Sequence, residues 1–126
     1  MPNYNTTLQI NNSSLEEIIT QLNNMPDAGG GSGGSIETCD VTVTDSTLNY
    51  VWVSQVIDGV ITGKQYTGTV SNTPITNVVK GSVMVCYTDS PYTRPTVTNC
   101  SMLTWVKIQN PSNGRDLAGI YAYTVG

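Results

Sequence analysis

The chain has 126 residues, enough for one compact domain and a peripheral segment. It carries five Lys and Arg against nine Asp and Glu, a formal net charge of -4 and no histidine. Without histidine, Ser-His-Asp and Cys-His catalytic sites are excluded, and the few cations form no basic stripe for nucleic acid. Ser, Thr and Asn make up roughly a third of the residues, and together with Val, Ile and Tyr they favour strands.

The first 28 residues are predicted to contain a short helix. Residues 13–17 (Ser-Ser-Leu-Glu-Glu) have the capping-box pattern, in which serine and glutamate side chains satisfy free amides at a helix start. Pro26 is expected to end the helix, because proline interrupts helical hydrogen bonding. The apolar residues recur at coiled-coil spacing and form a narrow stripe. This stripe consists of Leu8, Leu15, Ile18, Leu22 and Met25.

Residues 29–35 are Gly and Ser only and are predicted to form a flexible tether, natural or engineered, because no side chain there can pack. A helix that belongs to the core of the next domain is usually joined to it by a short turn. We therefore expect residues 1–28 to form an anchoring or oligomerisation segment. Leu and Ile mixed along the stripe favour more than two strands, so a homotrimer is expected. Docking on a larger partner and packing on its own domain are the alternatives.

Residues 36–126 are predicted to form one β-domain. Cys39, Val41 and Val43 alternate with polar residues, which is typical of a half-buried strand. Asp58-Gly59 between two strand-like runs predicts a type I′ hairpin turn. Many short strands predict a mainly β fold, a small antiparallel β-sandwich or barrel-like domain. The predicted strands are 39–44, 48–57, 60–70, 75–79, 82–88, 96–100, 102–109 and 117–125.

The cysteines and acidic residues show no pattern of a metal or catalytic site. Cys39, Cys86 and Cys100 lack zinc or redox spacing, and we expect buried free thiols. A Cys86–Cys100 bridge between neighbouring strands is the alternative in an oxidising setting. Most acids of the β-domain lie at predicted turns, which argues against a carboxylate pair or a calcium site. We expect a non-enzymatic protein with no catalytic residues, no metal and no cofactor.

Aromatic residues are the better candidates for binding. Phe is absent, so Trp52 and Trp105 are predicted to fill the core. Tyr92 and Arg94 lie in the proline-rich stretch 89–95, where a ring beside an arginine could stack on a sugar or a peptide. These two residues are the candidate ligand contacts, and a plain surface loop is the alternative.

The opening quarter of the chain combines residues 3–9 (Asn-Tyr-Asn-Thr-Thr-Leu-Gln), 11–15 (Asn-Asn-Ser-Ser-Leu) and 21–26 (Gln-Leu-Asn-Asn-Met-Pro) with a glycine run. In this combination it resembles small structural proteins of tailed phages and prophages of Firmicutes. Residues 39–43 and 77–83 are similar to stretches in the C-terminal domains of that group. The resemblance implies an appendage, fibre or head-decoration component, often oligomeric, and supplies no catalytic or ligand residues.

The expected function is therefore that of a phage virion structural protein, an appendage, fibre or head or tail decoration component. Its N-terminal segment would anchor or oligomerise it, and the β-domain would be displayed. We expect synthesis in the host cytoplasm without a signal peptide or membrane insertion, and assembly with its own copies and other virion proteins. The alternative is a host-surface carbohydrate-binding module, in which many copies turn weak contacts into avidity.

Overall fold

The structure is a computed structural model that describes residues 12–27, 36–90, 92 and 94–126. These residues form a mainly β fold with one short helix, which confirms the predicted fold class. No helix within these ranges is long and apolar enough to cross a membrane. The elements are α2 (Asn12–Asn24), β1 (Thr38–Val41), β2 (Val43–Thr44), β3 (Leu48–Ile57), β4 (Val60–Thr67), the 3-10 helix η1 (Gly68–Val70), β5 (Ile75–Val79), β6 (Val83–Thr88), β7 (Thr96–Val97), β8 (Cys100–Gln109) and β9 (Asp116–Val125).

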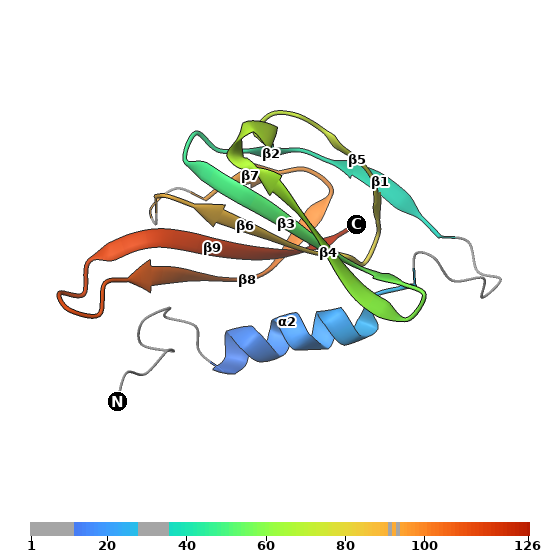
Figure 1. Ribbon diagram of the computed structural model, residues 1–126, viewed down its shortest axis with the longest axis horizontal. Helices are drawn as coiled ribbons and strands as arrows, with labels where there is room; N and C mark the ends of the chain where they lie inside the picture. Colours follow the sequence, from blue (N-terminus) through green and yellow to red (C-terminus); the bar gives the residue numbers. More distant parts are fainter. Residues whose placement is uncertain (1–11, 28–35, 91, 93) are drawn as a thin grey trace.

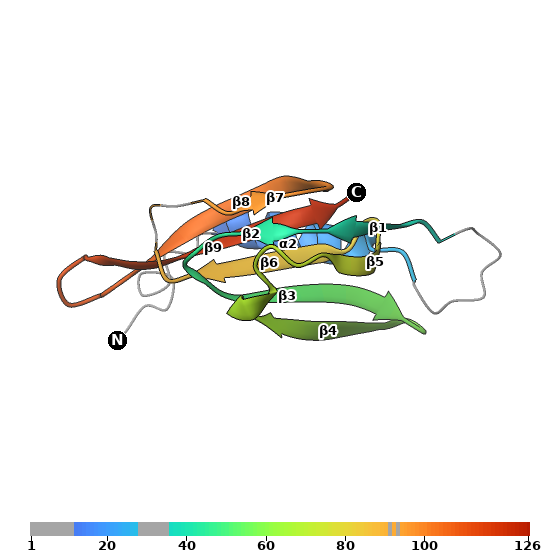
Figure 2. The same ribbon diagram turned by 90° about the horizontal axis from the view of Figure 1, so that it is seen from above.

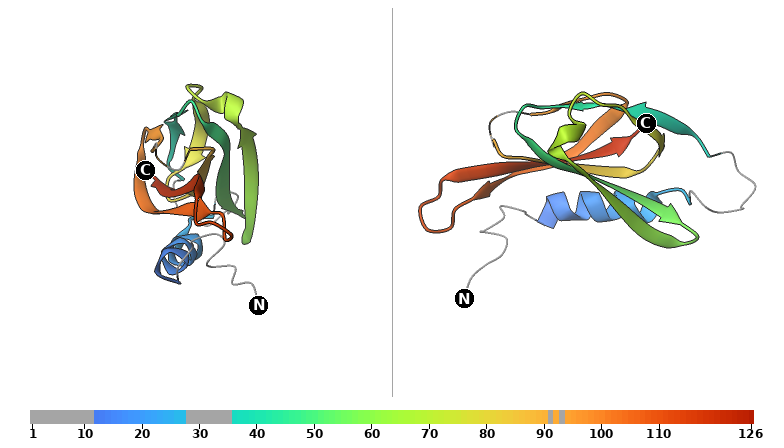
Figure 3. Two further views of the ribbon diagram at one scale, coloured as in Figure 1. Left: turned by 90° about the vertical axis from the view of Figure 1, so that its left-hand side faces the viewer. Right: turned by 45° about the horizontal axis from the view of Figure 1, so that its top comes forward.

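Three layers build the domain. The central layer is a five-stranded antiparallel sheet with the strand order β4-β3-β6-β9-β8. Two short two-stranded sheets, β1-β5 and β2-β7, cover one face, and α2 lies on the other (Figure 1). Figure 3 shows the same separation of the layers from two further sides. We call the face toward the short sheets the inner face and the face toward α2 the outer face.

The hydrophobic core lies between the five-stranded sheet and the two short sheets. The alternation predicted around Val41 and Val43 is confirmed, because both side chains are fully buried there. Half of the core residues are valine, which packs well on a pleated surface. The core cluster consists of Val41, Val43, Leu48, Val51, Val53, Ile75, Val78, Met84, Cys86, Tyr121, Tyr123 and Val125.

The β3-β4 hairpin confirms the prediction from its turn residues. Asp58 and Gly59 have φ angles of 53° and 80°, as a type I′ turn requires, and Ile57 pairs with Val60. The second strand ends at Thr67, earlier than predicted. At Gly68 the backbone passes so close to the Leu48 carbonyl that a Cβ would overlap it, and the chain turns there into η1.

The other strand boundaries agree with the prediction to within two residues, except in two places. The strand predicted over 39–44 divides into β1, which pairs with β5, and β2, which pairs with β7. The strand predicted over 96–100 ends at Val97 in the structure. Asn99 adopts a φ angle of 55°, which turns the chain so that Cys100 begins β8.

The alternative of a Cys86–Cys100 bridge assumed that the two cysteines lie on neighbouring strands, and this assumption is wrong. Cys86 lies on β6 and Cys100 on β8, and β9 runs between these two strands. Cys86 pairs with Tyr121, whereas Cys100 pairs with Val125. All three cysteines are free thiols, and burial raises the pKa of both Cys86 and Cys100 to about 12. At neutral pH these two thiols are therefore protonated and poor nucleophiles.

Helix α2 packs on the outer face of its own domain, the alternative that the glycine-rich stretch argued against. Val83 and Ala122 are each 1 % exposed, and their register directs both away from the core and toward the helix side of the sheet. Gln21 Nε2 donates to the Gly81 carbonyl at 2.8 Å, and Met25 is buried. The expectation that α2 does not pack on its own domain is wrong. Contacts between the helix and the sheet hold α2 in place, and these contacts do not depend on the segment that follows it in the sequence.

Asp27 fixes the end of this helical segment. Its carboxylate accepts from the backbone N–H groups of Asp58 at 3.0 Å and Gly59 at 2.8 Å, so it holds the turn of the β3-β4 hairpin. Asp27 also forms a parallel bridge with Val56. Ile18 and Leu22 of the predicted stripe are half-buried. Leu8, the side chain of Leu15 and residues 29–35 lie outside what the structure describes.

Candidate ligand-binding cleft

An open cleft of about 200 Å³ lies at one end of the sandwich and is lined by Tyr92, Arg94, Trp105 and Tyr121. Trp105 and Tyr121 stand opposite each other on β8 and β9. The β8-β9 hairpin extends beyond the two short sheets in Figure 1. The two candidate ligand residues named from the sequence, Tyr92 and Arg94, therefore meet two further aromatic residues.

The prediction that both tryptophans are buried in the core is wrong. Trp105 is 42 % exposed and Trp52 is 39 % exposed. Trp105 lies on the inner face of the edge strand β8, opposite Tyr121. Trp52 lies on the outer face beside Ser54, whose Oγ accepts from the indole Nε1 at 3.1 Å. Valine, methionine and two tyrosines fill the core in their place.

The rings of Trp105 and Tyr121 form the rigid wall of the cleft. They stack with their centroids 6.0 Å apart and their planes 12° apart. Tyr121 is only 2 % exposed and belongs to the core, so it supports the half-exposed indole from below. Burial, followed by the negative charge of Asp45, raises the pKa of Tyr121, which keeps its phenol neutral.

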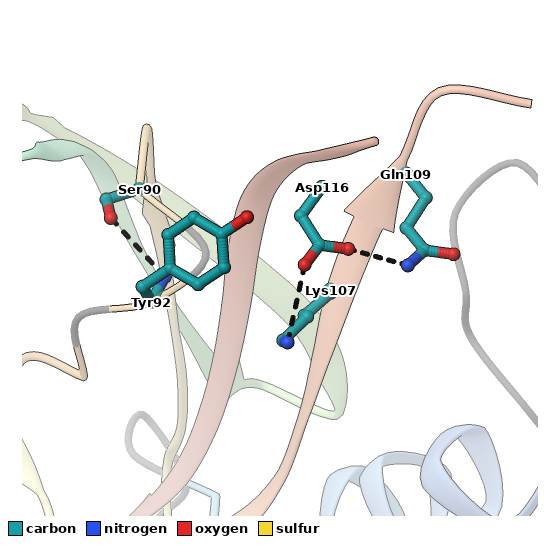
Figure 4. Close-up of polar contacts among 5 residues, drawn as sticks. All are labelled: Ser90, Tyr92, Lys107, Gln109 and Asp116. Atoms are coloured by element: carbon teal, nitrogen blue, oxygen red, sulfur yellow. Dashed lines mark hydrogen bonds and ion pairs between the residues drawn. The ribbon is translucent and has the colours of Figure 1, made fainter. Parts of the chain in front are cut away.

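The loop that carries Tyr92 is held at its start. Asp89 N donates to the Thr47 carbonyl at 2.8 Å, and Thr88 Oγ1 donates to the Ser90 carbonyl at 2.7 Å. Tyr92 N donates to Ser90 Oγ at 3.3 Å (Figure 4). The ring of Tyr92 nevertheless remains 75 % exposed, so its face is available to a ligand.

Three polar side chains, Asp116, Gln109 and Lys107, extend the cleft along the β8-β9 hairpin. Asp116 Oδ1 accepts from Gln109 Nε2 at 2.6 Å, and Asp116 Oδ2 accepts from Lys107 Nζ at 3.4 Å (Figure 4). Lys107 Nζ also lies 5.5 Å from the centroid of the Tyr92 ring, within cation–π range. The hydrogen bond from Gln109, with smaller contributions from Lys107 and Tyr92, lowers the pKa of Asp116. Asp116 is therefore a carboxylate at neutral pH and accepts hydrogen bonds.

Behind the cleft wall, two buried polar atoms have no hydrogen-bond partner among the described residues: Asp45 Oδ2 and the hydroxyl of Tyr123. Asp45 Oδ1 is satisfied by the backbone N–H and the hydroxyl of Thr47, at 2.7 and 2.6 Å. Burial raises the pKa of Tyr123 far above its ordinary value. This end of the domain thus holds buried polar groups as well as exposed rings.

Other hollows of the domain offer less for recognition. A cleft of about 290 Å³ between β4 and β5 contains one ring, Tyr66, with Lys64 Nζ 5.0 Å from its centroid. A groove between α2 and β8 has Glu16, Glu17, Met102 and Leu103 in its walls but no aromatic residue. In the described ranges, no group of three or more Cys, Asp or Glu residues is placed to hold a metal ion.

Sequence reasoning missed Trp105 and the polar group beside it, although the sequence contained a signal. Trp105, Lys107 and Gln109 alternate with apolar residues along one strand, which places them on one face. A face that carries Lys and Gln after Trp is not a core face at that end. Comparisons with protein-family models, with curated proteins and with solved structures find no match for the chain.

Proposed function

We propose that the chain is a non-enzymatic structural component of a phage virion, and that it displays its β-domain for binding to neutral carbohydrate on a surface. The observation that carries the binding proposal is the cleft lined by Tyr92, Arg94, Trp105 and Tyr121. Exposed aromatic faces can bury the apolar face of a sugar ring without charge neutralisation.

The polar groups around the cleft favour a neutral ligand. Lys107 is engaged by Asp116, so its charge is already balanced. Arg94 is then the one cation in the cleft wall, and the chain has a net charge of -4, which disfavours acidic polymers. Asp116 and Gln109 can exchange hydrogen bonds with sugar hydroxyls, which gives orientation to a ligand held by the rings.

The cleft is suited to binding rather than to glycoside hydrolysis. Hydrolysis needs two carboxyl groups on either side of the scissile bond, one of them with a raised pKa. None of the four lining residues is an acid, and the neighbouring Asp116 has a lowered pKa. A protonated general acid is therefore not supplied by these residues.

The virion setting is supported by the resemblance of the first quarter of the chain to phage structural proteins. Oligomerisation through Leu8, Leu15, Ile18, Leu22 and Met25 stays a prediction. Because Met25 is buried against the sheet, a trimer that used the whole stripe would require the end of α2 to leave the domain. Mass spectrometry and antibody labelling of purified particles of a phage that encodes the chain would test the virion setting, and particles without it would contradict the proposal.

The binding proposal is tested with a matched pair of tryptophan variants on an array of neutral and acidic glycans. Trp105→Ala removes a ring of the cleft, and Trp52→Ala removes a ring of nearly equal exposure on the opposite face. We expect Trp105→Ala to weaken binding at least about tenfold, as loss of one stacking contact does. Trp52→Ala should bind like the unaltered chain, and binding should change little with salt.

Thermal unfolding of both variants serves as the control for folding. Equal losses of binding in the two variants would assign the effect to stability and not to the cleft. Absence of binding to every neutral glycan by the unaltered chain would overturn the carbohydrate proposal. Binding restricted to acidic glycans, abolished by high salt, would contradict it as well.

A further inference from the structure

The two edge strands of the five-stranded sheet are protected to different degrees. The ladder between β8 and β9 has register shifts between Met102 and Thr104 and between Ile108 and Gln109, and α2 packs beside β8. In contrast, β4 follows β3 residue by residue with no shift, and the described elements leave its outer side open (Figure 2). Proteins normally guard a regular edge, because its free backbone groups pair with other strands.

The hairpin geometry identifies the free backbone groups of β4. In a type I′ hairpin, Ile57 and Val60 form the hydrogen-bonded pair nearest the turn. The pattern alternates along the strand, so the N–H and C=O groups of Ile61, Gly63 and Gln65 point away from β3. None of the loop and turn hydrogen bonds of the described residues reaches these three positions.

Apolar side chains gather along the same edge. Ile57, Val60 and Ile61 are 41 %, 63 % and 53 % exposed. The ring of Trp52 reaches over β4 and lies on Gly63, where any Cβ would overlap the indole. The absence of a side chain at Gly63 thus lets a half-exposed indole extend to the sheet edge.

We propose that β4 pairs with β4 of a second copy of this chain, antiparallel and about a twofold axis at Gly63. The alignment pairs Gly63 with Gly63 of the second copy, and Ile61 with Gln65 of the second copy, so every free backbone group along this stretch meets a complementary one. These pairs supply six backbone hydrogen bonds. The two sheets then form one continuous ten-stranded sheet.

A second copy fits this edge better than an unrelated strand for two reasons. Ile61, Gly63 and Gln65 exchange with one another under a twofold rotation at Gly63, as a self-complementary contact requires. The twofold axis also brings the two Trp52 rings together over a pair of glycines, which would bury both half-exposed indoles. The only charged side chain of β4, Lys64, pairs with Val53 and so projects from the inner face, away from this contact.

The contact is independent of the proposed carbohydrate site. The cleft lies at the β8-β9 side of the sheet, and β4 is the strand at the opposite edge. A dimer through β4 therefore leaves two clefts exposed, one in each copy. It also leaves α2 on its own domain, in contrast to a coiled-coil trimer.

Sedimentation of the full-length chain over a range of concentrations tests the proposal. We expect a reversible species of twice the chain mass of 13.5 kDa. Ile61→Lys places two charges at the contact and should raise the dissociation constant about 100-fold. Ile19→Lys is the matched control, because Ile19 is similarly exposed at 45 % but lies on α2, and it should leave the dimer intact.

The register is tested with a double variant, Ile61→Cys with Gln65→Cys. Paired residues of this type have Cα atoms about 5.5 Å apart, a separation that a disulfide spans. Oxidation should give a covalent dimer that reductant separates. A chain that stays monomeric at all concentrations would overturn the proposal. So would a trimer, or a dimer that Ile61→Lys does not weaken while circular dichroism shows the variant folded.

Discussion

The two outer hairpins of the sheet, β3-β4 and β8-β9, each present a half-exposed tryptophan, and they use it in different ways. In β3-β4, Trp52 lies on the outer face and over Gly63, at a regular edge that no described element covers. In β8-β9, Trp105 lies on the inner face, stacked on the core residue Tyr121 beside a loop that supplies Tyr92. Residue type and exposure therefore do not define a site. A site is defined by the face of the sheet on which the ring lies and by the neighbours of the ring.

The largest effect should come from removing the support under Trp105. Tyr121→Ala deletes a core ring that is 2 % exposed, and we expect a loss of about 3–5 kcal/mol in the free energy of unfolding. Denaturant unfolding measures this loss. Tyr87→Ala removes a half-buried ring that stacks on Tyr50 at 5.2 Å on the outer face, and its cost should be clearly smaller. Equal costs would mean that the Tyr50–Tyr87 stack supports the fold as much as the Trp105–Tyr121 stack does.

A smaller effect is expected at the other hairpin. Gly63→Ala places a methyl group into the Trp52 ring and should cost about 1–3 kcal/mol, as overpacking does. The same change in a Trp52→Ala background should cost much less, because the ring is no longer there. A double-mutant cycle by thermal unfolding measures this coupling. Additive costs would show that Trp52 does not lie on Gly63 in solution.

The smallest effect concerns the polar group of the β8-β9 hairpin and its pH dependence. The pKa of Asp116 is lowered by Gln109 and Lys107 in the folded chain. Its contribution to stability should therefore be present above the ordinary pKa of aspartate, about 3.9, and should be lost as the pH falls through the lowered folded value.

Melting temperatures of the unaltered chain and Asp116→Asn, taken between neutral and strongly acidic pH, test this expectation. The advantage of the unaltered chain should shrink as the pH falls. A difference that stays constant over this range would show that Asp116 does not act through its charge. Asp89→Asn is a suitable control, because Asp89 is an exposed acid in the neighbouring loop that accepts from Asn49 Nδ2 at 3.0 Å.

The sequence by itself determined the local structure of this protein. Period-two alternation predicted most strands, Asp58-Gly59 predicted the turn of the β3-β4 hairpin to the residue, and the span from the serines to Pro26 predicted α2. These features depend on backbone preferences and on neighbours in the chain, which the sequence contains directly. The candidate residues Tyr92 and Arg94 were named for the same reason, since a proline-rich stretch belongs in a loop.

Contacts between distant segments determine where the helix packs, which tryptophan faces which layer, and what surrounds Tyr92. The docking of α2 depends on Gly81, Val83 and Asp58, which are distant in the sequence. Trp105 is half-exposed on the edge strand β8 although it pairs with the buried Tyr121, and no residue near it in the chain encodes that edge position. Alternation gives the face of a strand, but cover over that face comes from segments brought together by folding.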